Sequence, residues 1–255
     1  MSFSSLTPLG LSEVEGYLRS QHPAAPVYAT CLHNTEEPDL ASWRGLSSMQ
    51  GIRRYHMNER GGSDIYANLY VDAERVWTAR PLDRDNWAHA YVQYGKKYAN
   101  WTDVHADAKR LCDGNRLWLN QHAIGVEVVG RFDRDDPTTS PSMSLALDLF
   151  ALMHRIYNIP LTNLLFHRMV EYKTCPGTRV SLDWFRAEVS ERLGQPIPEP
   201  APKYTLVGLD GVARPGPWMG EDQHGYIAIA TAAQAADVNV TWDGAKNQWT
   251  FSPKA

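Results

Sequence analysis

The stretch FHRMVEYKTCPG, residues 166–177, gathers three side chains that can do chemistry. His167 and Cys175 offer an imidazole and a thiolate, which are donors that zinc prefers, and Lys173 adds a cation between them. The gap between the two donors lets them straddle a loop, and Pro176-Gly177 favours a tight turn that would hold the sulfur in place. The stretch is therefore either half of a metal site or a loop that contains reactive side chains by chance.

A catalytic zinc needs a third protein ligand, because three ligands leave the fourth position open for water or substrate. His33 is the best candidate, since it follows the buried-strand pattern Pro26–Leu32 and strand ends are where α/β sheets present functional groups. Spacing alone is weak support, because the chain has nine histidines and a lone cysteine is usually a small buried hydrophobic residue. A purely structural zinc would need a fourth ligand, for which Cys31 and His122 stay open.

Four segments rich in β-branched and aromatic residues predict one sheet that positions these groups. They are Pro26–Leu32, Tyr66–Val71, Val76–Ala79 and Ala123–Val129. Helical spacing over Leu145–Ile156 and Leu182–Leu193 predicts two helices that cover the sheet, the second capped by Ser181. Tyr91–Asn120 is polar and aromatic without a persistent period, which indicates either a lid-like insertion or a helix with its own small core.

The length of 255 residues and the 43% hydrophobic content suit one α/β domain and a small second one. A proline-rich linker at 194–203 separates the predicted domains, 1–193 and 204–255. The second domain is expected to be small and α+β. Its predicted elements are a strand at Tyr226–Ile229, a short helix at Ala232–Ala236, and strands at Val238–Asp243 and Gln248–Phe251.

Composition excludes several classes of partner. A net charge of −4 without a dense Lys/Arg face gives no electrostatic case for nucleic acid. No stretch approaches the ~18 apolar residues of a membrane span, and the start of the chain lacks the basic and apolar regions of a signal peptide, so a cytoplasmic location is expected. Three cysteines argue against a disulfide framework.

Five motifs occur in one order over about residues 25 to 193. They are LHNT at 32–35, Tyr66 with Arg80 after it, AHA at 88–90, NQHAIGVEVVG at 120–130, and His167 with KTCPG at 173–177. This set resembles the type 2 N-acetylmuramoyl-L-alanine amidase family, which includes phage amidase endolysins, the bacterial amidase that recycles anhydro-muropeptides, and the peptidoglycan recognition proteins of animals. The resemblance implies a mixed central β-sheet flanked by helices. It also implies hydrolysis of the amide bond between N-acetylmuramic acid and L-alanine in bacterial peptidoglycan.

The resemblance assigns a role to each motif residue. One Zn²⁺ ion would be held by His33, His167 and Cys175, where the cysteine resembles the phage and recognition-protein branches. Lys173 falls on the position that steadies the developing oxyanion.

The acid/base residue stays open between two candidates. Tyr66 matches the phage branch and Glu127 the recycling branch. Each also has a structural interpretation, as a strand aromatic and as a paired carboxylate. Glu127 has apolar neighbours on both sides, where an unpaired carboxylate would be costly.

Three further residues, His89, Asn34 and Asn120, match family positions near the cleft and are predicted to bind substrate. The sequence departs from the family at Ala67, where many members have histidine. It also lacks an Asp-Gly turn between the predicted second and third strands, and its 91–120 segment is longer than usual. These departures concern the substrate groove rather than the metal.

We expect an endolysin-like enzyme that waits in the cytoplasm until it is released to the cell wall. The alternatives are an amidase that recycles soluble muropeptides and a recognition protein that binds without cutting; non-catalytic relatives usually lose the cysteine, so Cys175 favours the enzyme. Residues 204–255 resemble the small domain first named in copper amine oxidases. This domain is predicted to be either a stabilising cap or a wall-binding module that uses Trp218, Trp242 and Trp249. The oligomeric state is not predicted.

Overall fold

The computed structural model describes residues 5–89, 105–112, 117–171, 173–194, 205–207, 213–215, 238–243 and 248–253. The chain divides into two compact units, Met1–Pro198 and Glu199–Ala255.

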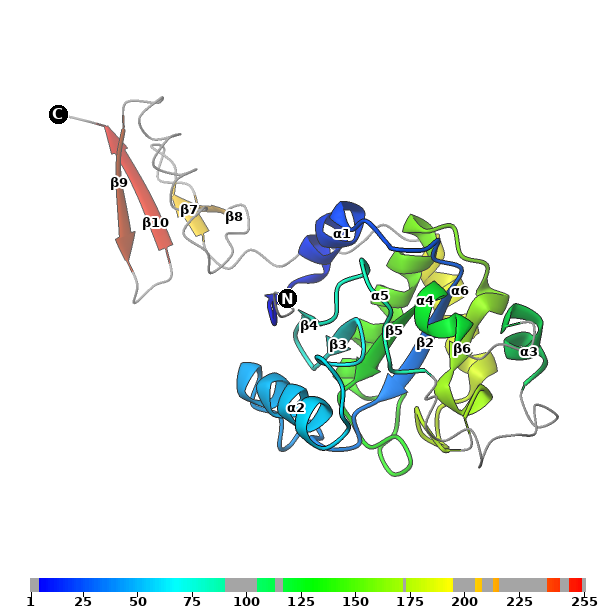
Figure 1. Cartoon of the computed structure of the whole chain (residues 1–255). Coiled ribbons are helices and arrows are strands. Elements are labelled where there is room, and N and C mark those ends of the chain that lie inside the picture. Colours follow the sequence, from blue (N-terminus) through cyan, green and yellow to red (C-terminus); the bar gives the residue numbers. More distant parts are fainter. Residues whose placement is uncertain are drawn as a thin grey trace. The chain divides into compact units, whose positions relative to one another are not determined.

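A six-stranded mixed sheet forms the centre of the first unit (Figure 1). The strands are β1 (Pro8–Leu9), β2 (Ala29–Asn34), β3 (Leu69–Val71), β4 (Val76–Thr78), β5 (Ala123–Val128) and β6 (Leu164–Phe166). Their order across the sheet is β1-β4-β3-β5-β2-β6. Strands β3, β5, β2 and β6 run parallel, whereas β4 is antiparallel to β3 and to β1. The predicted mixed sheet flanked by helices is confirmed.

Six α-helices of the described residues lie around this sheet. They are α1 (Leu11–Ser20), α2 (Leu46–Asn58), α3 (Ala106–Cys112), α4 (Trp118–His122), α5 (Pro141–Ile156) and α6 (Leu182–Leu193). Two 3₁₀ turns, Leu161–Asn163 and His167–Met169, flank β6. None of the helices in these described ranges is long and apolar enough to cross a membrane.

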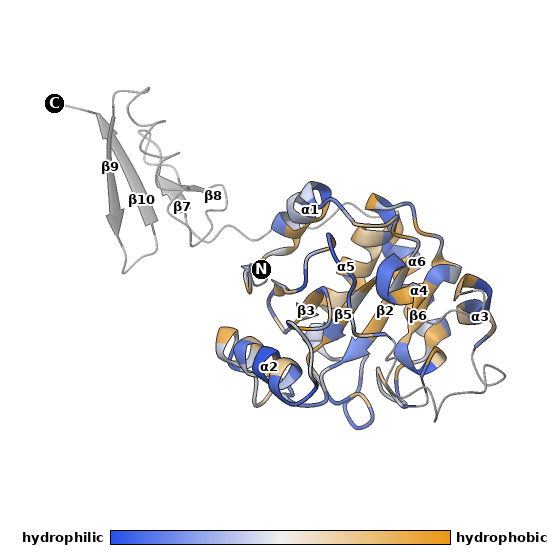
Figure 2. Cartoon of the chain, in the orientation of Figure 1, coloured by the Kyte–Doolittle hydropathy of each residue, from blue (hydrophilic) through white to orange (hydrophobic). Residues whose placement is uncertain are grey.

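Each face of the sheet has its own hydrophobic core. On one face, buried side chains of α1, α5 and α6 pack against the strands, and Phe185 of α6 meets Phe150 and Phe166 edge to face. On the other face, Met49 of α2 packs with Tyr70 and other aromatic residues. Hydrophobic residues accordingly dominate the central strands and α5 (Figure 2). Helix α2 therefore covers a face of the sheet that α5 and α6 leave free.

Several predicted boundaries are wrong by a few residues, and each shift has a physical reason. Strand β2 begins at Ala29 and extends to Asn34, because its partner β5 pairs with it as far as Val128. The predicted strand at Tyr66–Val71 begins only at Leu69. Before that point, the Asn68 side chain accepts from Gly125 N and donates to Arg80 O, so side-chain bonds replace part of the ladder.

The two predicted helices at 145–156 and 182–193 are present as α5 and α6. Helix α5 starts earlier, at Pro141, whose fixed φ suits a first helical turn. The Ser181 hydroxyl accepts from Trp184 N at 3.4 Å, as its predicted cap role requires. Helices α1 and α2 were not predicted, although Leu11, Val14 and Leu18 of α1 have helical spacing.

Two segments lie partly outside the described residues. In the predicted 91–120 insertion, the structure describes α3 and part of α4, while 90–104 and 113–116 lie outside. In the second unit, strands β7 (Thr205–Val207), β8 (Ala213–Pro215), β9 (Val238–Asp243) and β10 (Gln248–Pro253) form a sheet in the order β8-β7-β10-β9. The predicted strand at 226–229, the helix at 232–236 and most of the linker lie outside the described residues.

Candidate metal and active site

Three neighbouring parallel strands place polar side chains in one row. His33 of β2 pairs with Glu127 of β5, and Glu127 pairs in turn with Tyr70 of β3. Residues that pair directly across a sheet point to the same face, so the three side chains stand beside one another. The row lies towards the carboxyl ends of the strands, where functional groups collect in open α/β sheets.

His33 meets the two other predicted metal ligands at this edge. His33 Nδ1 lies 2.8 Å from His167 Nδ1, and Cys175 Sγ lies 3.9 Å from His33 Nδ1. Ligand atoms of all three residues lie within 4.8 Å of one another. Zinc binds imidazole nitrogen at about 2.0–2.1 Å and thiolate sulfur at about 2.3 Å. Two imidazoles and a thiol that converge in this way fit one zinc ion.

The protonation states of the donors agree with this chemistry. Burial lowers the pKa of His33 and of His167 well below the ordinary value, so both imidazoles are neutral, as metal ligands must be. Burial, followed by the charge of Glu127, raises the pKa of Cys175. The free thiol therefore keeps its proton, and metal binding would release it.

A second group of possible ligands shares His33. It consists of Cys31, His33 and His89, all of them buried. His33 reaches this group through its other nitrogen, because its Nε2 lies 2.9 Å from His89 Nδ1. A catalytic metal must be open to substrate, and this group is closed, whereas the group with Cys175 is partly exposed. The Cys175 group is the better candidate.

His89 lies behind His33 rather than at the surface, and none of its side chain is exposed. Its Nε2 faces Ala123 O at 3.3 Å and Asn86 Nδ2 at 2.9 Å. Asn86 Nδ2 can donate to an unprotonated His89 Nε2, and a protonated Nε2 can donate to Ala123 O, so the two distances correspond to the two tautomers of His89. In one of them His33 Nε2 donates to His89 Nδ1, His89 Nε2 donates to Ala123 O, and the lone pair of His33 Nδ1 is free for a metal.

Glu127 lies beside the ligands, with its Oε1 4.0 Å from His33 Nδ1. Burial raises the pKa of Glu127 to about 8, while the charge of Lys173 opposes the shift. A pKa near neutral pH is what a general acid/base residue needs.

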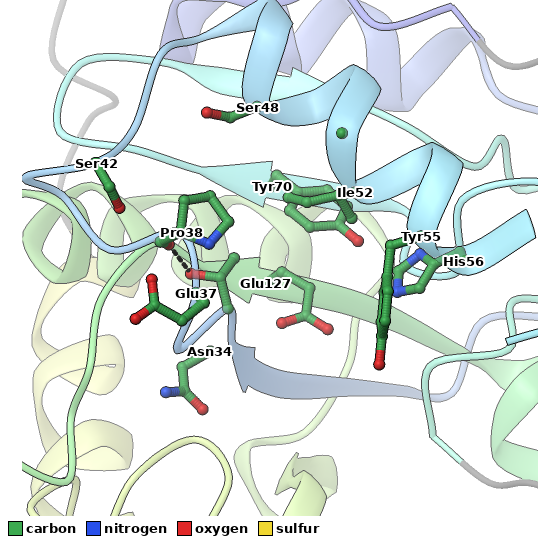
Figure 3. Close-up of a pocket in the computed structure, with 12 residues that line it drawn as sticks. Asn34, Glu37, Pro38, Ser42, Ser48, Ile52, Tyr55, His56, Tyr70 and Glu127 are labelled. Atoms are coloured by element: carbon green, nitrogen blue, oxygen red, sulfur yellow. Dashed lines mark hydrogen bonds between the residues drawn. The ribbon is translucent and has the colours of Figure 1, made fainter. Parts of the chain in front are cut away.

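A cavity of about 530 Å³ opens beside Glu127. Figure 3 shows the Glu127 carboxylate below Tyr70, with Tyr55 and His56 of α2 on one side and Glu37 on the other. The remaining lining residues come from the end of β2, the β2–α2 connection and α2: Asn34, Thr35, Pro38, Ser42, Ser48, Gly51 and Ile52. Its volume lies within the range of ligand sites, about 300–1,000 Å³.

Lys173 is exposed on the loop that carries Cys175. Although burial dominates the pKa shifts of the three ligands, the Lys173 charge lowers the pKa of each of them as well. The Lys173 charge therefore lies close enough to influence all three candidate ligands. Asn34 lines the cavity, and its side chain donates to Gly130 O.

Of the predicted catalytic and substrate-binding residues, Glu127 and Asn34 line the cavity, whereas His89, Lys173, Tyr66 and Asn120 do not. Tyr66 is buried, stacks on His56 with ring centroids 4.1 Å apart, and donates its hydroxyl to Arg60 O. Asn120 lies in α4, before the start of β5, whereas Glu127 is near the end of that strand. Tyr70 lines the cavity instead. Its sequence context, a strand aromatic beside Leu69, gave no sign of this, because its direction follows from the register with Glu127.

Comparison with known proteins identifies the family. A family model described as N-acetylmuramoyl-L-alanine amidase matches residues 23–178, more than half of the chain, and this range contains Glu127 and the three candidate ligands. The chain therefore belongs to the N-acetylmuramoyl-L-alanine amidase family. Its activity is hydrolysis of the amide bond between N-acetylmuramic acid and L-alanine in bacterial peptidoglycan. No curated protein sequence matches the chain.

Solved structures of related proteins resemble the chain at low identity. Wild-type PGRP-LB from Drosophila is 22% identical, with 67% of this chain and 83% of that chain covered and a TM-score of 0.44. The amidase LysC from Clostridium intestinale URNW is 18% identical, with 74% and 95% covered and a TM-score of 0.47. The Ph2119 endolysin from Thermus scotoductus MAT2119 bacteriophage Ph2119 is 22% identical, with 67% and 87% covered and a TM-score of 0.42.

Proposed function

We propose that this amidase depends on one zinc ion held by His33, His167 and Cys175, and that Glu127 is its general base. The observation that carries the proposal is the convergence of three donor atoms within 4.8 Å beside an ionisable carboxylate that opens onto a cavity. When bound, zinc would supply a Lewis acid and would bring the pKa of water towards ~7.

The ligand histidines of the metal-free protein already have the protonation state that zinc binding needs. Both histidines are neutral, and His89 accepts the Nε2 proton of His33 in the tautomer that leaves Nδ1 unprotonated. A partner that orients a ligand histidine in this way also raises its basicity. We therefore assign His89 to positioning His33 rather than to contact with substrate.

Glu127 would take a proton from the attacking water and return it to the departing L-alanine amine. Its position beside His33 Nδ1 places the carboxylate next to the candidate metal site, and its exposure to the cavity lets substrate reach it. The raised pKa of about 8 suits both halves of this task, because the carboxyl group both accepts and gives up a proton near neutral pH. Tyr66, the alternative base, has its hydroxyl engaged with Arg60 O.

Lys173 would stabilise the negative charge that develops on the carbonyl oxygen of the scissile amide. Removal of one such donor typically lowers the rate by about a hundredfold to a thousandfold. Asn34 and Tyr70 line the cavity next to Glu127 and are the residues we assign to substrate contact there.

We also propose an endolysin-like role in cell-wall lysis, in which the second unit binds the wall. The support for wall binding is the sequence pattern of three tryptophans, of which Trp242 and Trp249 are paired across β9 and β10. An amidase that recycles soluble muropeptides would gain nothing from such a unit. Intact cell walls should therefore be the better substrate for the full chain.

Mass spectrometry of the products from purified peptidoglycan tests the proposal. Zinc-loaded protein should release free stem peptides that begin at L-alanine, and chelator-treated protein should release them only after zinc is restored. Equal release with and without the chelator would disprove the zinc dependence. Intact muropeptides in both samples, with the protein bound to the wall, would instead support a recognition protein.

A further inference from the structure

The loop that carries Cys175 is tied to the β5–α5 connection by one carboxylate. Asp133 Oδ1 accepts a hydrogen bond from Thr178 N at 2.7 Å, and Asp133 Oδ2 accepts one from the Thr174 hydroxyl at 2.8 Å. These two donors flank Cys175 in sequence. A single side chain thus holds the loop on both sides of the candidate ligand.

The backbone of the same connection lies directly against the loop. Arg179 N donates to Phe132 O at 3.0 Å. Gly177 has a φ of +117°, and a Cβ on it would lie 2.4 Å from the backbone carbon of Phe132. No side chain fits there, so glycine permits the close approach that brings Thr174 and Thr178 within reach of Asp133.

Arg168 is the residue after His167 and makes a second set of hydrogen bonds to the Cys175 loop. Its backbone N–H donates to Cys175 O at 2.8 Å, and its guanidinium donates to Gly177 O at 2.7 Å and to Val180 O at 2.6 Å. Arg168 therefore links the loop to one ligand histidine, while Asp133 links it to the sheet that carries the other.

We propose that Asp133 is a positioning residue for the metal site, which holds the Cys175 loop so that Sγ stays within binding distance of His33 and His167. This inference rests on the zinc site proposed above. Cys175 is the candidate ligand that no helix or strand carries, and its neighbour Thr174 is exposed. Without the carboxylate, the loop would have to be ordered when the metal binds, and the metal affinity would fall.

The chain provides a matched control in the same connection. Asp136 also accepts from one backbone amide and one threonine hydroxyl, both of Thr138, at 2.9 and 2.8 Å. Its described hydrogen bonds stay within the β5–α5 connection, and Arg179 at the end of the Cys175 loop acts on it through charge. Asp133→Ala and Asp136→Ala therefore remove the same kinds of hydrogen bond, but only the first frees the loop.

The test is metal binding by the full chain, measured by zinc competition with a chromogenic chelator and by the thiolate-to-metal absorption band of the cobalt-loaded protein. Asp133→Ala should weaken zinc binding by about 10- to 100-fold and should weaken the cobalt band, whereas Asp136→Ala should bind like wild type. The melting temperatures of the two metal-free variants should fall by similar amounts. Thr174→Val, which removes only the hydroxyl, should also weaken zinc binding, but by less. This variant replaces Asp133→Ala in the test if Asp133→Ala does not fold.

Equal zinc affinity and an intact cobalt band in Asp133→Ala, or in Thr174→Val where the alanine variant does not fold, would overturn the positioning role and leave the zinc site standing. Failure of the wild type to bind either metal through Cys175 would overturn both.

Discussion

His33 and Cys175 reach the same candidate site by different means. His33 lies on a central strand, its direction is set by pairing with Glu127, and His89 supports its far nitrogen from a fully buried position. Cys175 lies in a partly exposed loop and depends on contacts from Asp133 and Arg168. The strand half of the site, which is His33 with Glu127 and His89, is therefore fixed by the fold itself. The loop half, which is Cys175, is fixed by a few polar contacts. Substitutions in the two halves should fail in different ways.

Loss of the loop ligand should have the largest effect. Cys175→Ser should remove zinc retention and amidase activity together, because the affinity should fall by more than the ~10- to 100-fold that loss of an outer-shell partner costs. Metal analysis after dialysis and the product assay would measure both. Cys112→Ser is the matched control, since Cys112 lies in α3 and belongs to neither group of possible ligands. Activity that survives in Cys175→Ser would show the ligand assignment to be wrong.

Loss of the carboxylate on the strand side should separate chemistry from metal binding. Glu127→Gln should lower kcat by about 10²- to 10⁴-fold, the usual contribution of a general base, while zinc content stays at the wild-type value. Glu37→Gln changes another carboxylate that lines the same cavity and should alter kcat only slightly. A kcat near the wild-type value in Glu127→Gln would point to another base.

Loss of the support behind His33 should weaken the strand half without removing a ligand. His89→Gln should lower zinc affinity by about 10- to 100-fold. His154→Gln is its control, because His154 is another buried histidine whose two nitrogens are engaged, by Thr30 Oγ1 and by Ile159 O, both at 2.9 Å. Chelator competition on the two variants gives the comparison, and equal affinities would remove His89 from the positioning role.

The smallest predicted effect concerns stability and pH. Burial lowers the pKa of His154 from 6.5 to about 4. Below pH 6.5 the unfolded chain binds a proton that the folded chain does not take up until about pH 4, so stability present above pH 6.5 is lost as the pH falls through this window. Between pH 7 and 5 the free energy of unfolding should fall by about 2 kcal/mol more in wild type than in His154→Gln. Urea unfolding of both proteins at both pH values measures the difference. An equal fall in the free energy of unfolding in wild type and in His154→Gln would contradict the lowered pKa.

The strand pattern was enough to predict one sheet, whereas the mixed arrangement and the three residues that converge at the candidate metal site followed from the resemblance of the motifs to the amidase family. Those residues sit in short motifs with restrictive spacing, such as the turn after Cys175. The pattern did not predict the cavity wall, because α2 has few apolar residues and Tyr70 resembles an ordinary strand aromatic. The depth of His89 was also not predictable. It depends on Gly125 of the neighbouring strand, where a Cβ would lie 2.9 Å from the His89 ring.

We expect zinc to bind between the two histidines, His33 and His167, and the loop residue Cys175. A crystal structure of the zinc-loaded full chain, with an anomalous difference map at the zinc edge, tests this site. One peak should lie about 2.0–2.1 Å from Nδ1 of His33 and of His167 and about 2.3 Å from Cys175 Sγ. A peak between Cys31, His33 Nε2 and His89, or no peak near His33, would contradict it.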